Sequence, residues 1–164
     1  MPTVVLALGD DVSTDTIYPG RYMATVLPSE TPQYAFADHA EFNARVKSHG
    51  LAPGSIIVAG QNFGCGSSRE QAASCLKGPE LTVVARGFAR IFLQNAINLG
   101  LRTIICPTVA ASERDELEFT ATEVVNTTTG KRFPIVPLPA ARQAIVDAGG
   151  LIPYVRQALR TQSL

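Results

Sequence analysis

The sequence predicts an α/β fold with a mostly parallel sheet flanked by helices. Apolar runs of strand length at residues 55–60, 81–85 and 102–106 are separated by segments in which apolar residues recur at helical intervals. Strand alternating with helix is typical of a parallel sheet. The pattern changes near residue 117, after which a C-terminal β-hairpin and helices are expected. No internal repeat, low-complexity tract or second domain is visible, so residues 1–164 are expected to form a single domain.

The first elements are predicted from apolar runs and from breakers of regular structure. Residues 3–8 are typical of a buried strand. Residues 9–35 contain prolines and acids with little periodicity, so we expect a long loop with a functional role there. Residues 38–48 suit a short helix. The strand at 55–60 (SIIVAG) then leads into a glycine-rich turn.

The middle of the chain continues the alternation. A helix is expected from about Ser68 to Lys77, and LTVVA at 81–85 is the next strand. Residues 88–100 (FARIFLQNAINLG) have helical periodicity that stops at a glycine, the residue most common just beyond a helix end. RTIIC at 102–106 is again typical of a strand.

The last third of the chain has a different character. LEFTATEVVNTTTGKRFPIV at 117–136 is typical of a β-hairpin that turns near Thr129 and Gly130. Helices are expected beyond it, at about 138–148 and 150–160.

Composition and charge exclude several classes of function. The chain has 14 basic and 14 acidic side chains and no run rich in Lys or Arg, so nucleic acid is not an expected partner. No apolar stretch reaches the roughly 20 residues of a membrane helix. No basic segment precedes residues 3–8, and Gly9, Asp10 and Asp11 follow them at once. No signal peptide is therefore expected, and the location is predicted to be cytoplasmic. Small molecules or proteins are the expected partners.

The three cysteines, Cys65, Cys75 and Cys106, lack the C-x-x-C spacing with which most local cluster and zinc motifs begin. No metal site is therefore predicted within this chain. Cys75 and Cys106 lie in apolar segments and are expected to act as small hydrophobic residues. Cys65 lies in the glycine-rich segment, where a helix N-terminus and Arg69 could lower its pKa, so a reactive thiol remains an alternative.

The most informative segment is NFGCGSSRE at residues 62–70. Gly64 and Gly66 allow the backbone to approach a ligand closely. Ser67 and Ser68 are expected at the first turn of a helix, where unpaired N–H groups point toward an anion. Arg69 adds a planar group suited to a carboxylate. The segment therefore predicts a site for a carboxylate substrate.

Each of these residues also has a purely structural interpretation. Ser67 or Ser68 could be only a helix N-cap. Arg69 could form a surface ion pair with Glu70 or Glu41. Asp15, in the preceding loop, could brace that loop through the threonines on either side of it.

Three motifs, in this order and at this spacing, resemble one family: DDVSTDTIYPGRYM at 10–23, NFGCGSSRE at 62–70 and FARIFLQNAINLGL at 88–101. The chain resembles the small subunits of isopropylmalate isomerase. More broadly it is similar to the swivelling domain of the aconitase superfamily, which includes homoaconitase and dimethylmaleate hydratase small subunits. GGLIPYVRQAL at 149–159 also fits, so the resemblance covers essentially the whole chain.

The resemblance implies an aconitase-type swivelling domain and a hydro-lyase that is active only with a large subunit. The large subunit would carry a [4Fe-4S] cluster, and this chain would bind no cofactor. Ser67 matches the family's base, which removes a proton from the carbon next to a carboxylate. Ser68 and Arg69 match its carboxylate-binding groups, and Asp15 an acid that lines the same site. Arg21, at the start of the next loop, is also expected to bind substrate.

The family's substrate specificity is attributed to the loop that here carries Tyr22, Met23, Ala24 and Thr25. Homoaconitase-like subunits tend to have an arginine in this stretch, which meets a third carboxylate. This loop offers no such charge, and an unpaired carboxylate would be costly to desolvate. We therefore expect isomerisation of 2-isopropylmalate and 3-isopropylmalate, a step of leucine biosynthesis. The alternatives are a related hydratase acting on dimethylmalate, citramalate or homocitrate, and a non-catalytic regulatory subunit.

One position departs from the family pattern. The family usually has histidine after S-S-R-E, and this chain has Gln71. Both side chains form hydrogen bonds, but only histidine titrates near neutrality. A structural role for that histidine would allow glutamine in its place, whereas a role in tuning the base would indicate another substrate. An isolated chain is expected to be able to form homo-oligomers through the surface meant for the large subunit.

Overall fold

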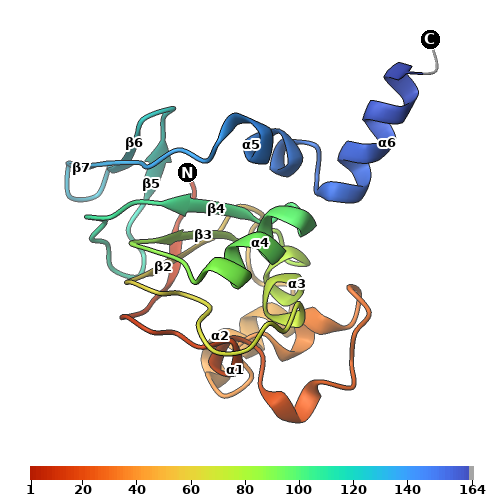
Figure 1. Cartoon of the computed structure of the whole chain (residues 1–164). Helices are drawn as coiled ribbons and strands as arrows, with labels where there is room; N and C mark the ends of the chain where they lie inside the picture. Colours follow the sequence, from red (N-terminus) through yellow and green to blue (C-terminus); the bar gives the residue numbers. More distant parts are fainter. Residues whose placement is uncertain (163–164) are drawn as a thin grey trace.

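The computed structural model describes residues 1–162, and its centre is a four-stranded parallel sheet (Figure 1). The strands are β1 (Val4–Ala7), β2 (Ile56–Ala59), β3 (Thr82–Ala85) and β4 (Arg102–Ile105), in the spatial order β1-β2-β3-β4. All three neighbouring pairs are parallel, as the alternation of strand and helix predicted. Because parallel strands end at the same edge of a sheet, the loops that follow them are brought together there.

Two layers cover this sheet, and each encloses its own apolar cluster. On one face lie the helices α2 (Ala40–Lys47), α3 (Gln71–Lys77) and α4 (Arg90–Leu99), whose buried side chains pack against alternate strand residues such as Ile57 and Val83. On the other face Ile56 and Val84 pack against a second sheet. Since successive side chains of a strand point to opposite faces, a strand buried on both faces needs a continuous apolar run.

The second sheet corrects the prediction of a simple hairpin. It contains three antiparallel strands, β5 (Leu117–Phe119), β6 (Glu123–Asn126) and β7 (Lys131–Pro134). The turn predicted near Thr129 and Gly130 joins β6 to β7, and Gly130 has the positive φ of 78° that such a turn uses. The additional turn depends on Thr120, whose hydroxyl accepts the backbone N–H of Glu123 at 3.0 Å.

The long loop predicted at 9–35 contains short helical segments that the sequence did not predict. A single α-helical turn, α1, spans Thr14–Ile17, and 3₁₀ turns span Gly20–Tyr22 (η1) and Thr31–Tyr34 (η2). The Ser13 hydroxyl caps α1 by accepting the N–H of Thr16 at 3.1 Å. One turn is too short to show apolar periodicity, so the sequence pattern cannot reveal it.

The start of α3 is also corrected. The helix begins at Gln71 rather than near Ser68, and Glu70 occupies its N-cap position without a side-chain cap bond. Ser67 and Ser68 therefore precede the helix. The interpretation of either serine as the cap of this helix is wrong.

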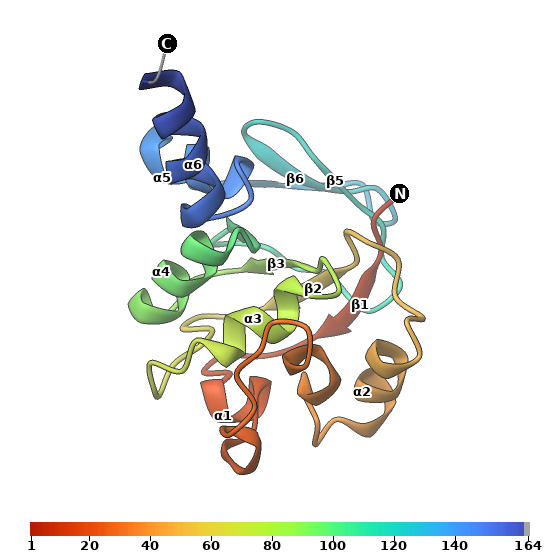
Figure 2. The same ribbon diagram turned by 90° about the vertical axis from the view of Figure 1, so that its right-hand side faces the viewer.

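The chain ends in α5 (Ala140–Asp147) and α6 (Leu151–Gln162), close to the predicted helices. Both views show α6 projecting away from the body of the protein (Figures 1 and 2). The turn between the two helices packs against the end of α4, backbone to backbone: a Cβ at Gly150 would lie 2.6 Å from the carbonyl oxygen of Asn98. Among residues 1–162, no helix combines the length and the apolar character needed to cross a membrane.

Candidate functional site

The loops that follow β1, β2 and β3 lie side by side beyond the sheet. Isolated parallel bridges join Ser13 to Cys65 and Phe63 to Phe88. Thr14 donates its backbone N–H to the carbonyl of Cys65 at 2.8 Å. These bonds continue the pairing of the sheet and place α1 directly against the glycine-rich segment.

Two glycines give this segment its path. Gly64 has a φ of 87°, and a Cβ there would lie 2.2 Å from Cγ of Phe92, a buried residue of α4. Gly66 has a φ of 104°, and a Cβ there would lie 3.3 Å from the Thr14 hydroxyl oxygen. Because L-residues rarely adopt this backbone conformation, both positions favour glycine.

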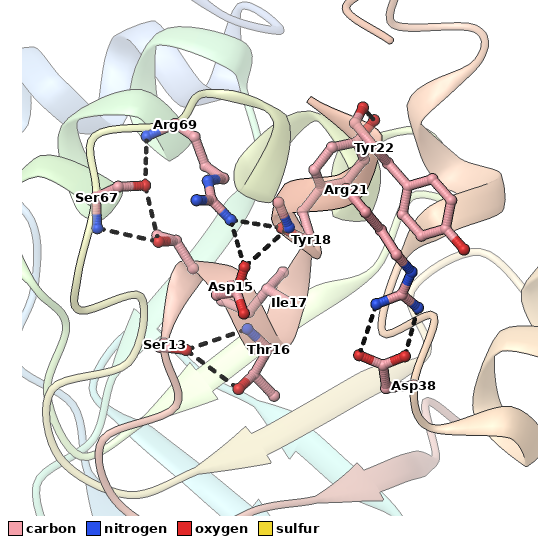
Figure 3. Close-up of polar contacts among 12 residues, drawn as sticks. Ser13, Asp15, Thr16, Ile17, Tyr18, Arg21, Tyr22, Asp38, Ser67 and Arg69 are labelled. Carbon is pink, nitrogen blue, oxygen red and sulfur yellow. Dashed lines mark hydrogen bonds and ion pairs between the residues drawn. The ribbon is translucent and has the colours of Figure 1, made fainter. Parts of the chain in front are cut away.

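Ser67 is exposed, and its hydroxyl lies among polar groups (Figure 3). Ser67 Oγ is 3.1 Å from Oγ1 of Thr14 and accepts the backbone N–H of Arg69 at 3.4 Å. The backbone N–H of Ser67 donates to the same Thr14 oxygen at 3.1 Å. Thr14 was not among the predicted site residues; its only signal in the sequence is its place directly before Asp15.

Arg69 and Asp15 form an ion pair, although they lie 54 positions apart in the chain. Arg69 Nη1 donates to Asp15 Oδ1 at 3.0 Å and to the carbonyl of Tyr18 at 2.9 Å. Only 13% of the Arg69 side chain is exposed, so the expected alternative of a surface pair with Glu70 or Glu41 is wrong. Arg69 Nε is buried, with no hydrogen-bond partner in the described part of the chain.

The Asp15 carboxylate also orders the chain that follows it. The Gly20 backbone N–H donates to Asp15 Oδ1 at 2.8 Å. The Arg69 guanidinium, and then this N–H, hold the pKa of Asp15 below its ordinary value of 3.8. Asp15 thus braces its loop, but through Arg69 and Gly20 rather than through Thr14 and Thr16.

Ser68 is exposed next to Ser67, and its main chain is held by α4. Asn95 Nδ2 donates to the carbonyl of Ser68 at 3.2 Å. This bond fixes the backbone between Ser67 and Arg69 while leaving the Ser68 hydroxyl at the surface.

Arg21 does not join this group. Its guanidinium forms an ion pair with Asp38, with Nη1 donating to Oδ2 at 3.2 Å and Nη2 donating to Oδ1. Figure 3 shows both residues on the far side of α1 from Ser67. The pair raises the pKa of Arg21 and lowers the pKa of Asp38. A role for Arg21 in substrate binding stays a prediction.

The predicted specificity loop is held by its backbone while its apolar side chains are open to solvent. The Tyr18 hydroxyl donates to the carbonyl of Tyr22 at 3.0 Å and lies 3.1 Å from that of Thr25. The Tyr22 ring stacks on Tyr34, with centroids 4.1 Å apart. Exposed side chains follow along the loop: Met23, Ala24, Val26 and Leu27.

Gln71 has a structural role in this arrangement. Its Nε2 donates to the carbonyl of Met23 at 3.3 Å, which ties the specificity loop to the first residue of α3. An uncharged amide is sufficient for this bond, so glutamine at this position is compatible with a loop-holding role.

The cysteines differ in exposure. Cys75 and Cys106 are buried, and burial raises the pKa of both thiols, to about 11 for Cys106. Cys65 is partly exposed in the glycine-rich segment. Across residues 1–162, no three His, Cys, Asp or Glu side chains gather in a way that could hold a metal ion.

A groove of about 520 Å³ lies elsewhere, between the ends of β1 and β2 and the turn before β7. None of the site residues predicted from the sequence lines it. Ser67, Ser68 and Asp15 instead face solvent on an open surface, so a small substrate bound there would need a second wall.

Comparison with known proteins identifies the family of this chain. The family model described as the aconitase C-terminal domain matches residues 13–108, which include α1 and the glycine-rich segment. The 3-isopropylmalate dehydratase small subunit of Moorella thermoacetica is 43% identical over 159 residues, covering 93% of each chain. The isopropylmalate/citramalate isomerase small subunit of Methanocaldococcus jannaschii is 42% identical, covering 94% of this chain and 93% of that protein.

A solved structure is similar over nearly the whole length. The crystal structure of 3-isopropylmalate dehydratase from Methanocaldococcus jannaschii superposes with a TM-score of 0.88 at 38% sequence identity, covering 98% of this chain and 96% of that one. The chain belongs to the aconitase C-terminal domain family and, within it, to the 3-isopropylmalate dehydratase small subunits. The fold class predicted from the sequence is confirmed.

Proposed function

We propose that this chain is the small subunit of a two-subunit hydro-lyase that interconverts 2-isopropylmalate and 3-isopropylmalate, as in leucine biosynthesis. The observation that carries the proposal is the juxtaposition of Ser67, Arg69 and Asp15 on an exposed face. Two loops from distant parts of the chain build it, and a largely buried guanidinium lies beside an exposed serine. Membership of the family supplies the substrate class.

In this proposal Ser67 removes a proton from the carbon next to a substrate carboxylate. A serine hydroxyl is a weak base, so its alkoxide must be stabilised by nearby donors and positive charge. The backbone N–H of Arg69 donates to Ser67 Oγ, and the guanidinium of the same residue adds positive charge to this surface. The local structure thus offers what such a base needs.

Arg69 and Ser68 would bind the carboxylate itself. Asp15 and the carbonyl of Tyr18 engage Nη1 of Arg69, which leaves Nη2 for a substrate oxygen. The exposed Ser68 hydroxyl adds a second donor next to it. Asp15 holds the guanidinium in place, and charge-assisted hydrogen bonds of this kind are short and directional.

The loop from Tyr22 to Leu27 favours an alkyl group over a third carboxylate. Met23, Val26 and Leu27 present apolar surface, which is 46%, 63% and 55% exposed. An alkyl group covered by this surface would gain about 25 cal/mol per Å² of apolar area buried. A third carboxylate would have to lose its hydration without a compensating charge. Isopropylmalate is therefore the first candidate, with dimethylmalate or citramalate next and homocitrate disfavoured.

In this proposal the partner large subunit carries the [4Fe-4S] cluster, which would activate the leaving hydroxyl as a Lewis acid. This chain binds the substrate carboxylate, removes the proton from the neighbouring carbon and contacts the alkyl group. The same partner would supply the second wall over the open surface of Ser67.

A cytoplasmic location is part of the proposal and is supported by three free cysteines. The single-domain organisation of residues 1–164 and the homo-oligomer of an isolated chain stay predictions.

The test is turnover by the chain reconstituted anaerobically with its large subunit. Isopropylmalate, dimethylmalate, citramalate and homocitrate are compared by the absorbance of the unsaturated intermediate. Ser67→Ala should lower turnover at least about 100-fold while the complex still forms, because loss of a positioned base costs about 10²–10⁴. The matched control, Ser112→Ala, removes another exposed serine, which lines the groove that contains none of the predicted site residues. Substantial activity in Ser67→Ala would remove Ser67 as the base.

A further inference from the structure

We propose that Thr14 is a positioning residue that sets the reactivity of Ser67 by donating a hydrogen bond to its hydroxyl oxygen. The inference deepens the proposed function and rests on it, because it concerns the base of that reaction. The observation behind it is the position of Thr14, a residue only 2% exposed, whose hydroxyl oxygen lies 3.1 Å from both the nitrogen and the hydroxyl oxygen of Ser67.

The direction of the bond follows from the available protons. The Ser67 backbone N–H can only donate, so Thr14 Oγ1 accepts that bond. Thr14 has one proton of its own, and a buried hydroxyl in a folded protein donates to a partner. Ser67 Oγ is the acceptor that the described residues place within reach of this hydroxyl. Thr14 therefore donates to Ser67 Oγ.

Two donors then converge on one oxygen. Thr14 and the backbone N–H of Arg69 both point at Ser67 Oγ, so the serine's own proton is directed away from them, toward the exposed side where the substrate would lie. Donors aimed at an oxygen stabilise its deprotonated form and lower its pKa. The burial of Thr14 strengthens the effect, because water competes little with a bond from a buried group.

The surrounding structure holds Thr14 for this task. It is the first residue of α1, its backbone N–H is bound to the carbonyl of Cys65, and its branched side chain has few rotamers. Gly66 leaves the hydroxyl room, since a Cβ at Gly66 would lie 3.3 Å from Thr14 Oγ1. The hydroxyl is therefore fixed relative to Ser67 from two loops.

The first test uses the reconstituted enzyme and compares Thr14→Val, which removes the hydroxyl and keeps the shape, with Thr14→Ser, which keeps the hydroxyl. Removing one preorganised donor should lower kcat about 100-fold. KM should change much less, because Thr14 does not touch the substrate carboxylate. In Thr14→Val the rise of kcat with pH should move to higher pH. Thr14→Ser should retain most of the activity and the wild-type pH profile.

The second test does not depend on turnover. In the full-length small subunit carrying Cys65→Ala, Ser67→Cys introduces a thiol at the position of the base, and its pKa is read from the pH dependence of its alkylation by iodoacetamide, followed in the peptide that contains residue 67. Adding Thr14→Val should raise that pKa. Adding Ser112→Ala, the control, should leave it unchanged.

The outcomes separate this inference from the proposed function. If Thr14→Val has the kcat and pH profile of the wild type while Ser67→Ala is inactive, the role of Thr14 is overturned and the assignment of Ser67 as the base still holds. An unchanged thiol pKa in the double variant would overturn it even if kcat falls. Substantial activity in Ser67→Ala would instead refute the assignment of the base, whatever Thr14 does.

Discussion

Replacement of Gly64 by alanine should destabilise the protein by about 2–5 kcal/mol. Holding an L-residue in the left-handed conformation costs about 1–2 kcal/mol. The new methyl would also lie 2.2 Å from Cγ of Phe92, which is only 2% exposed and packs against the rings of Phe63 and Phe88. Forcing extra atoms into a packed core costs about 1–3 kcal/mol more. The loop that carries Ser67 would move as a result, so activity should fall with stability.

Gly54 provides the matched control. Its φ of 83° is nearly that of Gly64 at 87°, but nothing lies within 4 Å of a Cβ built there. Gly54→Ala should therefore cost only the backbone term of about 1–2 kcal/mol. The free energies of unfolding come from urea titrations followed by circular dichroism. Equal losses in the two variants would refute the argument that Phe92 dictates glycine at position 64.

Three further predictions concern the site. Because Arg69 lowers the pKa of Asp15, this pair stabilises the protein above the ordinary carboxyl pKa of 3.8, and the contribution is lost as the pH falls through the lower pKa of the folded state. Asp15→Asn should therefore reduce the loss of unfolding free energy at acid pH. A wild-type dependence of that free energy on pH in this variant would contradict the pairing. Gln71→Ala should raise KM about 2- to 10-fold, the worth of one hydrogen bond to Met23, while Gln71→His should not. Ellman's reagent should label Cys65 first in the native protein, and the two buried thiols only on unfolding; rapid labelling of a buried thiol would contradict the packing.

The parallel sheet could be predicted because its central strands, β2 and β3, are buried on both faces. That requirement produces continuous apolar runs such as IIVA at Ile56–Ala59, which are visible without any knowledge of the tertiary structure. The helix from Arg90 to Leu99 was equally visible, since it buries one face and ends at Gly100. These elements depend on interactions that repeat along the sequence.

The errors fall where one or two side chains decide the structure. The Ser13 cap makes a single helical turn, Thr120 splits the hairpin into two turns, and α3 begins at Gln71 without a capping side chain. None of these leaves a periodic signal. The pairing of Asp15 with Arg69 spans 54 positions, so it arises only when the loops after β1 and β2 meet.

The bridges between the loops that follow β1, β2 and β3 have a consequence for how enzymes of this kind diversify. The segments carrying Thr14 and Ser67 are bound by main-chain hydrogen bonds that continue the sheet. The segment from Tyr22 to Leu27 is attached mainly through side chains, those of Tyr18, Tyr22 and Gln71. In the proposed function, proton transfer and substrate choice therefore belong to separate segments of the chain. A related enzyme could then change its substrate by a few substitutions in this loop, with the residues around Ser67 unchanged.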